Sequence, residues 1–312
     1  MGKYAFGVDV GGTSVKLGLF SREGEILEKW EIPTVTENAG ARVLPDIAQS
    51  ILGKMAEKGI GEDDLAGIGV GAPGGVDGDG NLVNGAVNIG WGSFNIPEAL
   101  RAYIKVPVKA ANDANAAAFG EMWQGSGRGY KNIVVVTLGT GVGGGIIIDG
   151  KIVNGTTGSG GEIGHMHLVD DEKEPCGCGA YGCLEQYASA TGIARLARRR
   201  LEKDDKASVL RGGHISAKTV FDAVKEGDAV AIEIAEQFGE YLGRGLAMVA
   251  SVVDPEIFIV SGGVSKAGDI LLSFIRPAYR KYAFRECRKA KFVLAQLGND
   301  AGICGAAGLI LR

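Results

Sequence analysis

The chain has 312 residues, a length that favours about two domains of ~150 residues each. Its 33 basic and 37 acidic residues give a formal net charge of -4, which does not favour binding to nucleic acid or to an anionic membrane. The sequence has no long apolar signal region, and its apolar stretches are too short to span a bilayer. We therefore expect a soluble cytoplasmic protein.

The first segment, residues 4–33, predicts a strand, a glycine turn, a second strand, another turn and a third strand. The glycine turn is the sequence Asp9-Val10-Gly11-Gly12-Thr13. Backbone amides and the Thr13 hydroxyl of such a turn can bind phosphate oxygens, with Asp9 near a magnesium ion. An ordinary hairpin turn is the alternative interpretation, because Gly-Gly is common there.

An amphipathic helix is expected around residues 42–58, and a polar, glycine-rich segment covers 77–91. A later strand ends at Asn112, where Asp113 begins a helix of small residues. Asp113 is the N-cap of that helix in the simpler interpretation. Its place at a strand end, between two glycine loops, instead favours a general base for a hydroxyl that attacks a γ-phosphate.

Residues 137–147 read TLGTGVGGGII, in which Gly139, Gly141 and Gly144 have the G-x-G-x-x-G spacing of a dinucleotide loop. That loop requires a helix after the glycines, whereas a β-branched run follows here, so we expect the glycines to join two strands. Such a turn still binds phosphate, which favours ATP over NAD. Because this segment repeats the pattern of residues 4–33, we predict an internal duplication with one phosphate loop in each copy.

A cysteine-rich loop follows, in which His165, Cys176, Cys178 and Cys183 have the spacing H-x10-C-x-C-x4-C. Three thiolates and an imidazole suit a four-coordinate structural Zn²⁺, and unliganded thiols are the alternative. His167 is an alternative ligand to His165.

Glu162 and Glu185 flank this cluster in weakly charged surroundings, where their carboxylates could accept hydrogen bonds from the hydroxyls of a sugar. Solvated surface carboxylates are the simpler interpretation of both. Asn88, Asn112 and Asp113 would add further polar groups to such a sugar site.

Helices are expected at 189–203, 216–226 and 228–252, before a buried strand that runs into Ser261-Gly262-Gly263-Val264. This turn either takes the nucleoside end of ATP or is a plain turn between a strand and a helix. Strands and helices alternate in both halves, so the fold class is α/β. We predict a small domain of residues 1–113 plus 298–312 and a large domain of residues 114–297.

Taken together, these motifs resemble the ROK family of sugar kinases and repressors, within the actin-like ATPase and hexokinase superfamily. The resemblance covers nearly the whole chain. It implies a two-domain actin-like ATPase fold, which is a duplicated ribonuclease H-like unit with an interdomain cleft. The motifs that carry it are DVGGT, GAPGGVD, NDANAAAFGE, LGTGVGGG, GEIGH, CGCGAYGCLEQYAS and SGGV.

The resemblance further implies an ATP-dependent hexose kinase with a catalytic Mg²⁺ and a structural Zn²⁺, in which Asp113 is the general base. The positions that match zinc ligands are His165, Cys176, Cys178 and Cys183. The positions that match sugar contacts are Gly75, Asn88, Asn112, Asp113, Glu162, His165 and Glu185. The positions that match contacts to ATP or magnesium are Asp9, Gly11, Gly12, Thr13, Lys16, Thr140, Gly141, Gly143, Gly262, Gly263 and Val264.

Within the family, GAPGGVD, residues 88–91 and CLEQYAS are most similar to bacterial glucose kinases, so phosphorylation of the glucose 6-hydroxyl is the favoured activity. N-acetylmannosamine, N-acetylglucosamine, fructose, mannose and allose remain alternative acceptors, and polyphosphate an alternative donor. A sugar-sensing repressor is less favoured, because Asp9 lies near the N-terminus and no basic recognition helix is evident. A structural or chaperone ATPase of the superfamily would lack the His-Cys cluster. The family resemblance also implies a homodimer or homotetramer.

Overall fold

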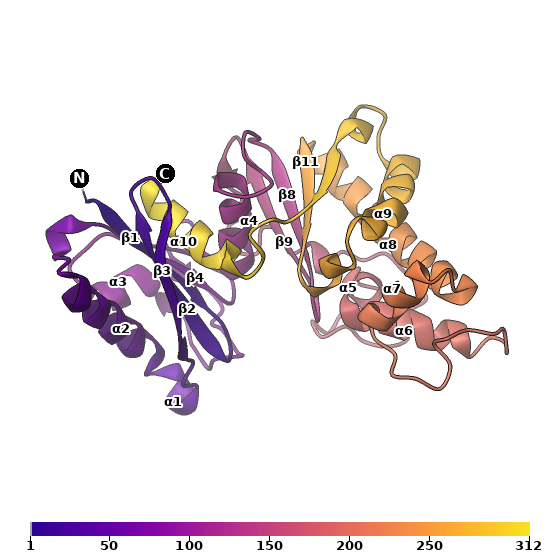
Figure 1. Ribbon diagram of the computed structural model, residues 1–312, viewed down its shortest axis with the longest axis horizontal. Helices are drawn as coiled ribbons and strands as arrows, with labels where there is room; N and C mark the ends of the chain where they lie inside the picture. Colours follow the sequence, from indigo (N-terminus) through magenta and orange to yellow (C-terminus); the bar gives the residue numbers. More distant parts are fainter. Residues whose placement is uncertain (1) are drawn as a thin grey trace. The chain divides into compact units, whose positions relative to one another are not determined.

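The computed structural model describes residues 2–312, which form two compact units (Figure 1). The first unit holds the described residues up to Gly129, together with Gly145–Gly161 and Gln296–Arg312. The second unit holds Tyr130–Gly144 and Glu162–Ala295. Among residues 2–312, no helix combines the length and the apolar character needed to cross a bilayer.

Two five-stranded sheets have the same strand order. It is β3-β2-β1-β4-β7 in one sheet and β10-β9-β8-β11-β12 in the other. In each sheet the last three strands of this order are parallel to one another: β1, β4 and β7 in the first sheet, and β8, β11 and β12 in the second. This repeated order confirms the predicted duplication. The first sheet consists of β1 (Tyr4–Val10), β2 (Ser14–Ser21), β3 (Ile26–Pro33), β4 (Leu65–Ala72) and β7 (Val108–Asn112). The second consists of β8 (Ile133–Leu138), β9 (Val142–Ile148), β10 (Lys151–Ile152), β11 (Ile257–Ser261) and β12 (Lys291–Leu294).

The polar, glycine-rich segment contains a small pair of antiparallel strands, β5 (Asn81–Leu82) and β6 (Phe94–Asn95). The helices of the first unit are α1 (Glu37–Gly40), α2 (Val43–Lys58), α3 (Ile96–Arg101), α4 (Asp113–Trp123) and α10 (Ala301–Leu311). The helices of the second unit are α5 (Glu185–Ala188), α6 (Ala190–Leu201), α7 (Ala217–Lys225), α8 (Ala229–Val253) and α9 (Asp269–Tyr282).

The C-terminal helix α10 packs against both the first sheet and α4 (Figure 1). Glycines make this close approach feasible, because a Cβ at Gly305 would overlap the carbonyl oxygen of Ala116 on α4. A Cβ at Gly69 of β4 would likewise overlap the carbonyl oxygen of Ala306. The backbones of α10, α4 and β4 are therefore nearer to one another than side chains would allow.

This packing explains how the compact units differ from the predicted domains. We placed a boundary just after Asp113, but α4 lies in the first unit because its small side chains contact α10. The segment Gly145–Gly161 also belongs to the first unit, where Gly145 faces Ala114 and Ala118 of α4. The predicted return of the C-terminal segment to the first domain agrees with the place of α10.

We predict that Gly305→Ala lowers the free energy of unfolding by several kcal/mol, about the upper end of overpacking costs, because the methyl group would meet rigid backbone. Gly53→Ala is the control, since Gly53 is an exposed position within α2 with no heavy atom within 4 Å of an added Cβ. Gly53→Ala should raise the free energy by about 1 kcal/mol through helix propensity. Urea denaturation measures both, and equal effects would contradict the packing argument.

Candidate functional site

The first glycine turn joins β1 to β2, as predicted. The Gly11 amide donates to the Ser14 carbonyl at 3.1 Å, and the Thr34 hydroxyl donates to the Gly11 carbonyl at 2.7 Å. Gly12 and Thr13 are both exposed at the tip of the turn. Because both residues are exposed, their backbone amides are accessible to a phosphate group.

Asp9 lies at the carboxyl end of β1, where its strand neighbours are Lys16 of β2 and Gly71 of β4. Its carboxylate also faces the first turn of α10, because a Cβ at Gly302 would be 2.5 Å from the Asp9 Cγ atom. The start of a helix carries positive potential, so this orientation favours a carboxylate.

Asp113 stands at the same edge of the first sheet, directly after β7, which pairs in parallel with β4. It is not the N-cap of α4. Asn112 takes that role, since its side-chain oxygen accepts from the Asn115 amide at 3.1 Å. The Asp113 carboxylate accepts from the Ala114 amide at 2.8 Å and from the Asn112 side-chain amide at 3.0 Å. These bonds fix the direction of the carboxylate.

The two carboxylates influence each other. The pKa of Asp9 is raised from 3.8 to about 6, chiefly by burial and then by the nearby charge of Asp113, while Lys16 acts in the opposite direction. The carboxyl ends of parallel strands are the usual ligand-binding edge of an α/β sheet. This edge therefore combines a glycine turn with two interacting carboxylates, which suits a cation and a phosphoryl group.

Two predicted sugar contacts lie elsewhere in the same unit. The Asn88 side-chain nitrogen lies 3.7 Å from where a Cβ on Gly12 would be, so Asn88 is next to the first glycine turn. Gly75 packs against the 157–158 loop, where an added Cβ would be 2.7 Å from the Thr157 carbonyl oxygen. The side-chain amide of Asn112 is engaged by the protein itself, because it donates to the Gly74 carbonyl and to Asp113.

The second glycine loop joins β8 to β9, and the prediction that a strand follows it is confirmed. Glu185 holds this loop, because its carboxylate accepts from the Val142 amide at 3.0 Å and lies against Gly141. The Thr191 hydroxyl donates to the Thr140 carbonyl at 2.8 Å. Gly143 lies one position beyond Val142, inside β9.

The predicted metal ligands come together in the second unit. One ligand atom from each of His165, Cys176, Cys178 and Cys183 lies within 4.8 Å of the others. The sulfur atoms of Cys178 and Cys183 are 3.7 Å apart, and the Cys176 sulfur is 3.8 Å from His165 Nδ1. Burial, and after it the neighbouring thiols of Cys178 and Cys176, raise the pKa of the Cys183 thiol to about 12. A metal ion at this donor set would have to displace thiol protons.

His167 does not join this cluster, although its spacing allowed it. Its Nδ1 donates to the Tyr181 carbonyl at 2.8 Å, and its Nε2 is 2.8 Å from an Asp170 carboxylate oxygen. Glu162 lies on the outer side of His165, with 3.9 Å between its carboxylate and Nε2. Thus Nδ1 of His165 faces the thiols while Nε2 faces Glu162.

A buried ion-pair network anchors the cysteine-rich loop. The Glu172 side chain is only 2% exposed and accepts from Arg195, Arg199 and Tyr187. Burial alone would raise the pKa of Glu172, but the hydrogen bonds from Arg199 and Tyr187 hold it well below its usual range. Removing one partner of such a buried network is costly, so the network fixes the loop to α6.

A cavity of about 350 Å³ adjoins Gly263 and Val264. Its volume lies within the ~300–1,000 Å³ range of small-molecule pockets. Helix α7 forms its other wall with Ser216, Phe221 and Lys225, which sequence reasoning missed. The sequence predicted only a helix at 216–226; in the structure Ser216 is the N-cap of α7 as well as part of the cavity wall.

The sequence motifs also left Asn115 of α4 without a role. It is 1% exposed, and its side-chain amide has no hydrogen-bond partner within residues 2–312. Buried amides are nearly always paired, so this one is a candidate to bind water or a ligand group beside Asp113.

Comparison with known proteins identifies the family of this chain and its relatives. The sequence model of the ROK family matches residues 5–312. The glucokinase of Halalkalibacterium halodurans is 43% identical, over 99% of this chain and 95% of its own. The N-acetyl-D-glucosamine kinase of Aliivibrio salmonicida is 32% identical, over 98% of this chain and 99% of its own. The crystal structure of a ROK family glucokinase from Streptomyces griseus with glucose and AMPPNP has a TM-score of 0.75 and 36% identity, and 98% of each chain is covered.

The raised pKa of Asp9 predicts a pH-dependent cost in stability. The folded chain binds this proton up to pH about 6, whereas the unfolded chain releases it near 3.8. The ionised carboxylate is therefore unfavourable to folding above pH 6, and the cost disappears as the pH falls from 6 towards 4. Asp9→Asn should raise the free energy of unfolding at pH 8 by about 3 kcal/mol, and by much less at pH 4.

Urea denaturation across this pH range measures the effect, with Asp79→Asn as a control at an exposed carboxylate in the same unit. A gain in Asp9→Asn that does not vary with pH would contradict the assignment.

Proposed function

The chain belongs to the ROK family, and we propose that it is an ATP-dependent kinase that transfers the γ-phosphoryl group to the 6-hydroxyl of glucose. The observation that carries this proposal is the sheet edge where Asp113 stands beside Asp9 and the first phosphate turn. The glucokinase of Halalkalibacterium halodurans, at 43% identity over nearly the full length, supports glucose as acceptor.

Asp113 is the proposed general base. Its carboxylate accepts two hydrogen bonds from the start of α4, which orient it without removing its capacity to accept a further proton. In phosphoryl transfer, such a base positions the attacking hydroxyl and takes up its proton. Asn88, next to the first phosphate turn, would contact a sugar hydroxyl.

Phosphate contacts come from both glycine turns in this proposal. Gly11, Gly12 and Thr13 would contribute in the first unit, and Thr140 and Gly141 in the second. Mg²⁺ neutralises charge on the transferred phosphoryl group when it is bound, and Asp9 is the residue that would hold it. The raised pKa of Asp9 fits this role, because a cation would relieve the cost of the buried charge.

The cavity beside Gly263 and Val264 supports ATP as donor. Phe221 and Val264 give it apolar walls for a base, and Lys225 lies at the same cavity. Residues Gly262–Val264 would therefore contact the adenosine end.

The His-Cys cluster would hold a structural Zn²⁺. Three thiols and an imidazole fill a tetrahedral site, so the metal would shape the loop without binding a catalytic water. Glu185 connects this cluster to the second glycine loop, since the Cys176 sulfur is 3.6 Å from one oxygen and the Val142 amide donates to the other. Glu162, His165 and Glu185 are the proposed sugar contacts of the second unit.

N-acetylglucosamine is the second candidate acceptor, because an N-acetyl-D-glucosamine kinase is 32% identical over nearly the full length. Glucose is preferred because the glucokinase has the higher identity. The proposal also includes a cytoplasmic homodimer or homotetramer.

A coupled kinase assay across a sugar panel tests the function. We expect glucose with ATP to give the highest kcat/KM, and a higher value for N-acetylglucosamine or another hexose would overturn the choice of sugar. Asp113→Asn should lower kcat about 10²–10⁴-fold with little change in glucose binding, because only proton transfer is lost. Asp79→Asn is the matched control and should retain parent activity. Rates in Asp113→Asn equal to those of the control would refute the base assignment.

Metal analysis tests the zinc proposal. The purified chain should contain about one zinc per molecule, and Cys178→Ser should lose it, because one of four ligands is removed. We expect KM for glucose to rise in this variant, since His165 and Glu185 would lose their support. Cys304→Ala, which alters a cysteine of α10 outside the cluster, should keep the metal. Equal zinc content in both variants would exclude the cluster as the site.

A further inference from the structure

The connection between β3 and α2, residues 34–41, includes α1 and has a strained backbone. Asn38 (φ 52°, ψ 47°) and Ala39 (φ 57°, ψ 38°) are left-handed, and Gly40 follows with a φ of 65°. Residues other than glycine rarely adopt this conformation, and two in succession are rarer still. Such strain persists only where the surrounding structure imposes it, and it is concentrated at functional sites. Residues 34–41 are named the strap below.

The left-handed part of the strap packs directly on a second turn, residues 86–91. A Cβ at Gly40 would be 2.5 Å from the Ile89 carbonyl oxygen. A Cβ at Gly90 would be 2.9 Å from the Cα atom of Ala39. The two backbones are therefore in contact without side chains between them. If the strap relaxed to a right-handed conformation, this contact would be lost.

One buried hydrogen bond also joins the two turns. The Trp91 indole Nε1 donates to the Gly40 carbonyl at 3.1 Å, and Trp91 is only 7% exposed. Its ring packs edge-on against Phe94 with 5.2 Å between the ring centroids. A cavity of about 270 Å³ adjoins Ala39, Gly40 and Trp91, so side chains do not fill the space beside this contact. The indole bond and the backbone contact therefore hold the strap without support from that side.

The other end of the strap holds the first glycine turn. The Thr34 amide donates to the Thr13 carbonyl at 3.0 Å, and the Thr34 hydroxyl donates to the Gly11 carbonyl at 2.7 Å. One short segment thus binds both the glycine turn and the turn of residues 86–91. The strap therefore determines how these two turns are placed relative to each other.

Asn88 lies between the two turns that the strap holds. It is exposed, whereas Ile89 and Trp91 of the same turn are buried. Its side-chain nitrogen is 3.7 Å from a Cβ built on Gly12. The buried residues fix the turn, and Asn88 is left accessible to a ligand beside the glycine turn.

We propose that the strap positions Asn88 to bind a hydroxyl of the acceptor sugar, with Trp91 and Ala39 as positioning residues. This inference rests on the proposed function, in which Asn88 is a sugar contact. Asp113 is oriented separately, by its bonds at the start of α4. A disturbed strap should therefore weaken sugar binding and leave phosphoryl transfer intact.

Trp91→Phe removes the indole bond and keeps an aromatic ring. It should raise the KM for the sugar about fivefold with kcat nearly unchanged, because a ground-state contact is weakened. The KM for ATP should stay at the parent value, since Thr34 still holds the glycine turn. Trp30→Phe is the matched control. It also removes one indole bond, from Trp30 to the Ser50 hydroxyl at 2.8 Å in the same unit, and it should keep the parent KM.

Two substitutions of Ala39 test the left-handed turn itself. Ala39 is exposed, so a larger side chain does not disturb the core. A β-branched residue disfavours positive φ, whereas glycine adopts it freely. Ala39→Val should therefore raise the KM for the sugar as Trp91→Phe does, and Ala39→Gly should keep the parent value.

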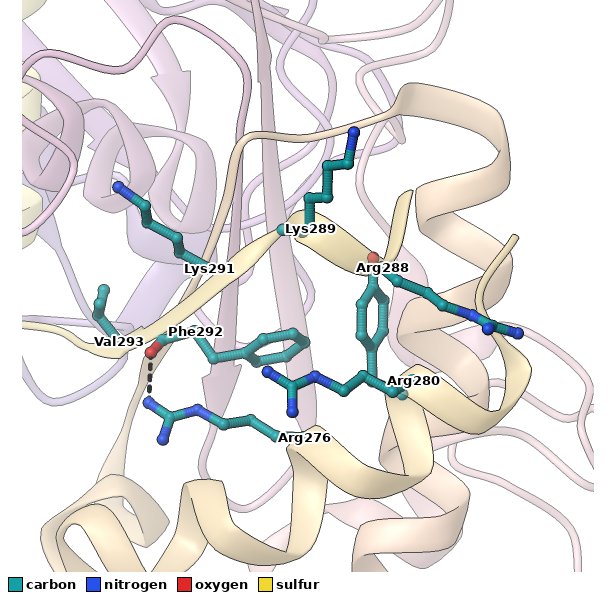
Figure 2. Close-up of a pocket in the computed structure, with 9 residues that line it drawn as sticks. Arg276, Arg280, Arg288, Lys289, Lys291, Phe292 and Val293 are labelled. Atoms are coloured by element: carbon teal, nitrogen blue, oxygen red, sulfur yellow. Dashed lines mark hydrogen bonds between the residues drawn. The ribbon is translucent and has the colours of Figure 1, made fainter. Parts of the chain in front are cut away.

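A control in the second unit separates this effect from a general loss of stability. Arg276 of α9 donates to the Phe292 carbonyl at 2.8 Å, beside a cavity of about 370 Å³ (Figure 2). Like the Trp91 bond, it joins a side chain to a backbone carbonyl. Arg276→Met should leave the KM for the sugar unchanged, whatever its effect on the melting temperature.

Steady-state kinetics of the full chain measures these outcomes, with the sugar that has the highest kcat/KM in the panel. An error in the choice of glucose therefore does not affect the test. With an active parent chain, equal KM values in Trp91→Phe and Trp30→Phe would overturn the inference but not the proposed function. If Trp91→Phe does not fold, equal KM values in Ala39→Val and Ala39→Gly would overturn it. A parent chain inactive with every sugar would overturn the proposed function, and this inference with it.

Discussion

The buried charge of Asp9 is the constraint on which the first unit depends. Burial at the end of β1 disfavours the ionised Asp9 carboxylate, and the charge of Asp113 nearby adds to the cost. Such a pair persists only where the backbone around it is rigid. Helix α10 supplies that rigidity, because glycines at positions 69, 302 and 305 let it approach β4, Asp9 and α4. The unfavourable charge of Asp9 lies at the sheet edge where a bound cation and phosphoryl group would stabilise it.

A different set of contacts organises the second unit. Its glycine loop is held by Glu185, which also contacts the Cys176 thiol of the metal-ligand cluster. The loop that carries the cluster is in turn fixed to α6 by the buried Glu172 network. A change at the cluster would therefore be transmitted to the glycine loop through one carboxylate. Through this link, a zinc ion bound at the cluster would influence turnover without taking part in the chemistry.

Sequence patterns predicted the parts that local chemistry determines. The sequence predicted the repeated strand pattern, the strand that follows Gly141 and the His-Cys cluster. It could do so because glycine turns, β-branched runs and ligand spacing are short-range signals. The N-cap was misassigned in the simpler interpretation, since Asn112 and Asp113 are both good caps and only the backbone decides between them. The roles of the individual site residues stay proposals.

Features formed by distant segments were not predictable. The wall that α7 gives to the cavity beside Gly263 and Val264, and the return of residues 145–161 to the first unit, each require contacts between elements far apart in sequence.

The most direct test of the carboxylate pair is a carbon-13 NMR titration of the Asp9 carboxyl group in the metal-free chain. The account predicts a midpoint near pH 6, and a lower midpoint in Asp113→Asn, where the repelling charge is absent. A midpoint near the ordinary value of 3.8, unchanged by that substitution, would show that Asp9 and Asp113 do not form one site.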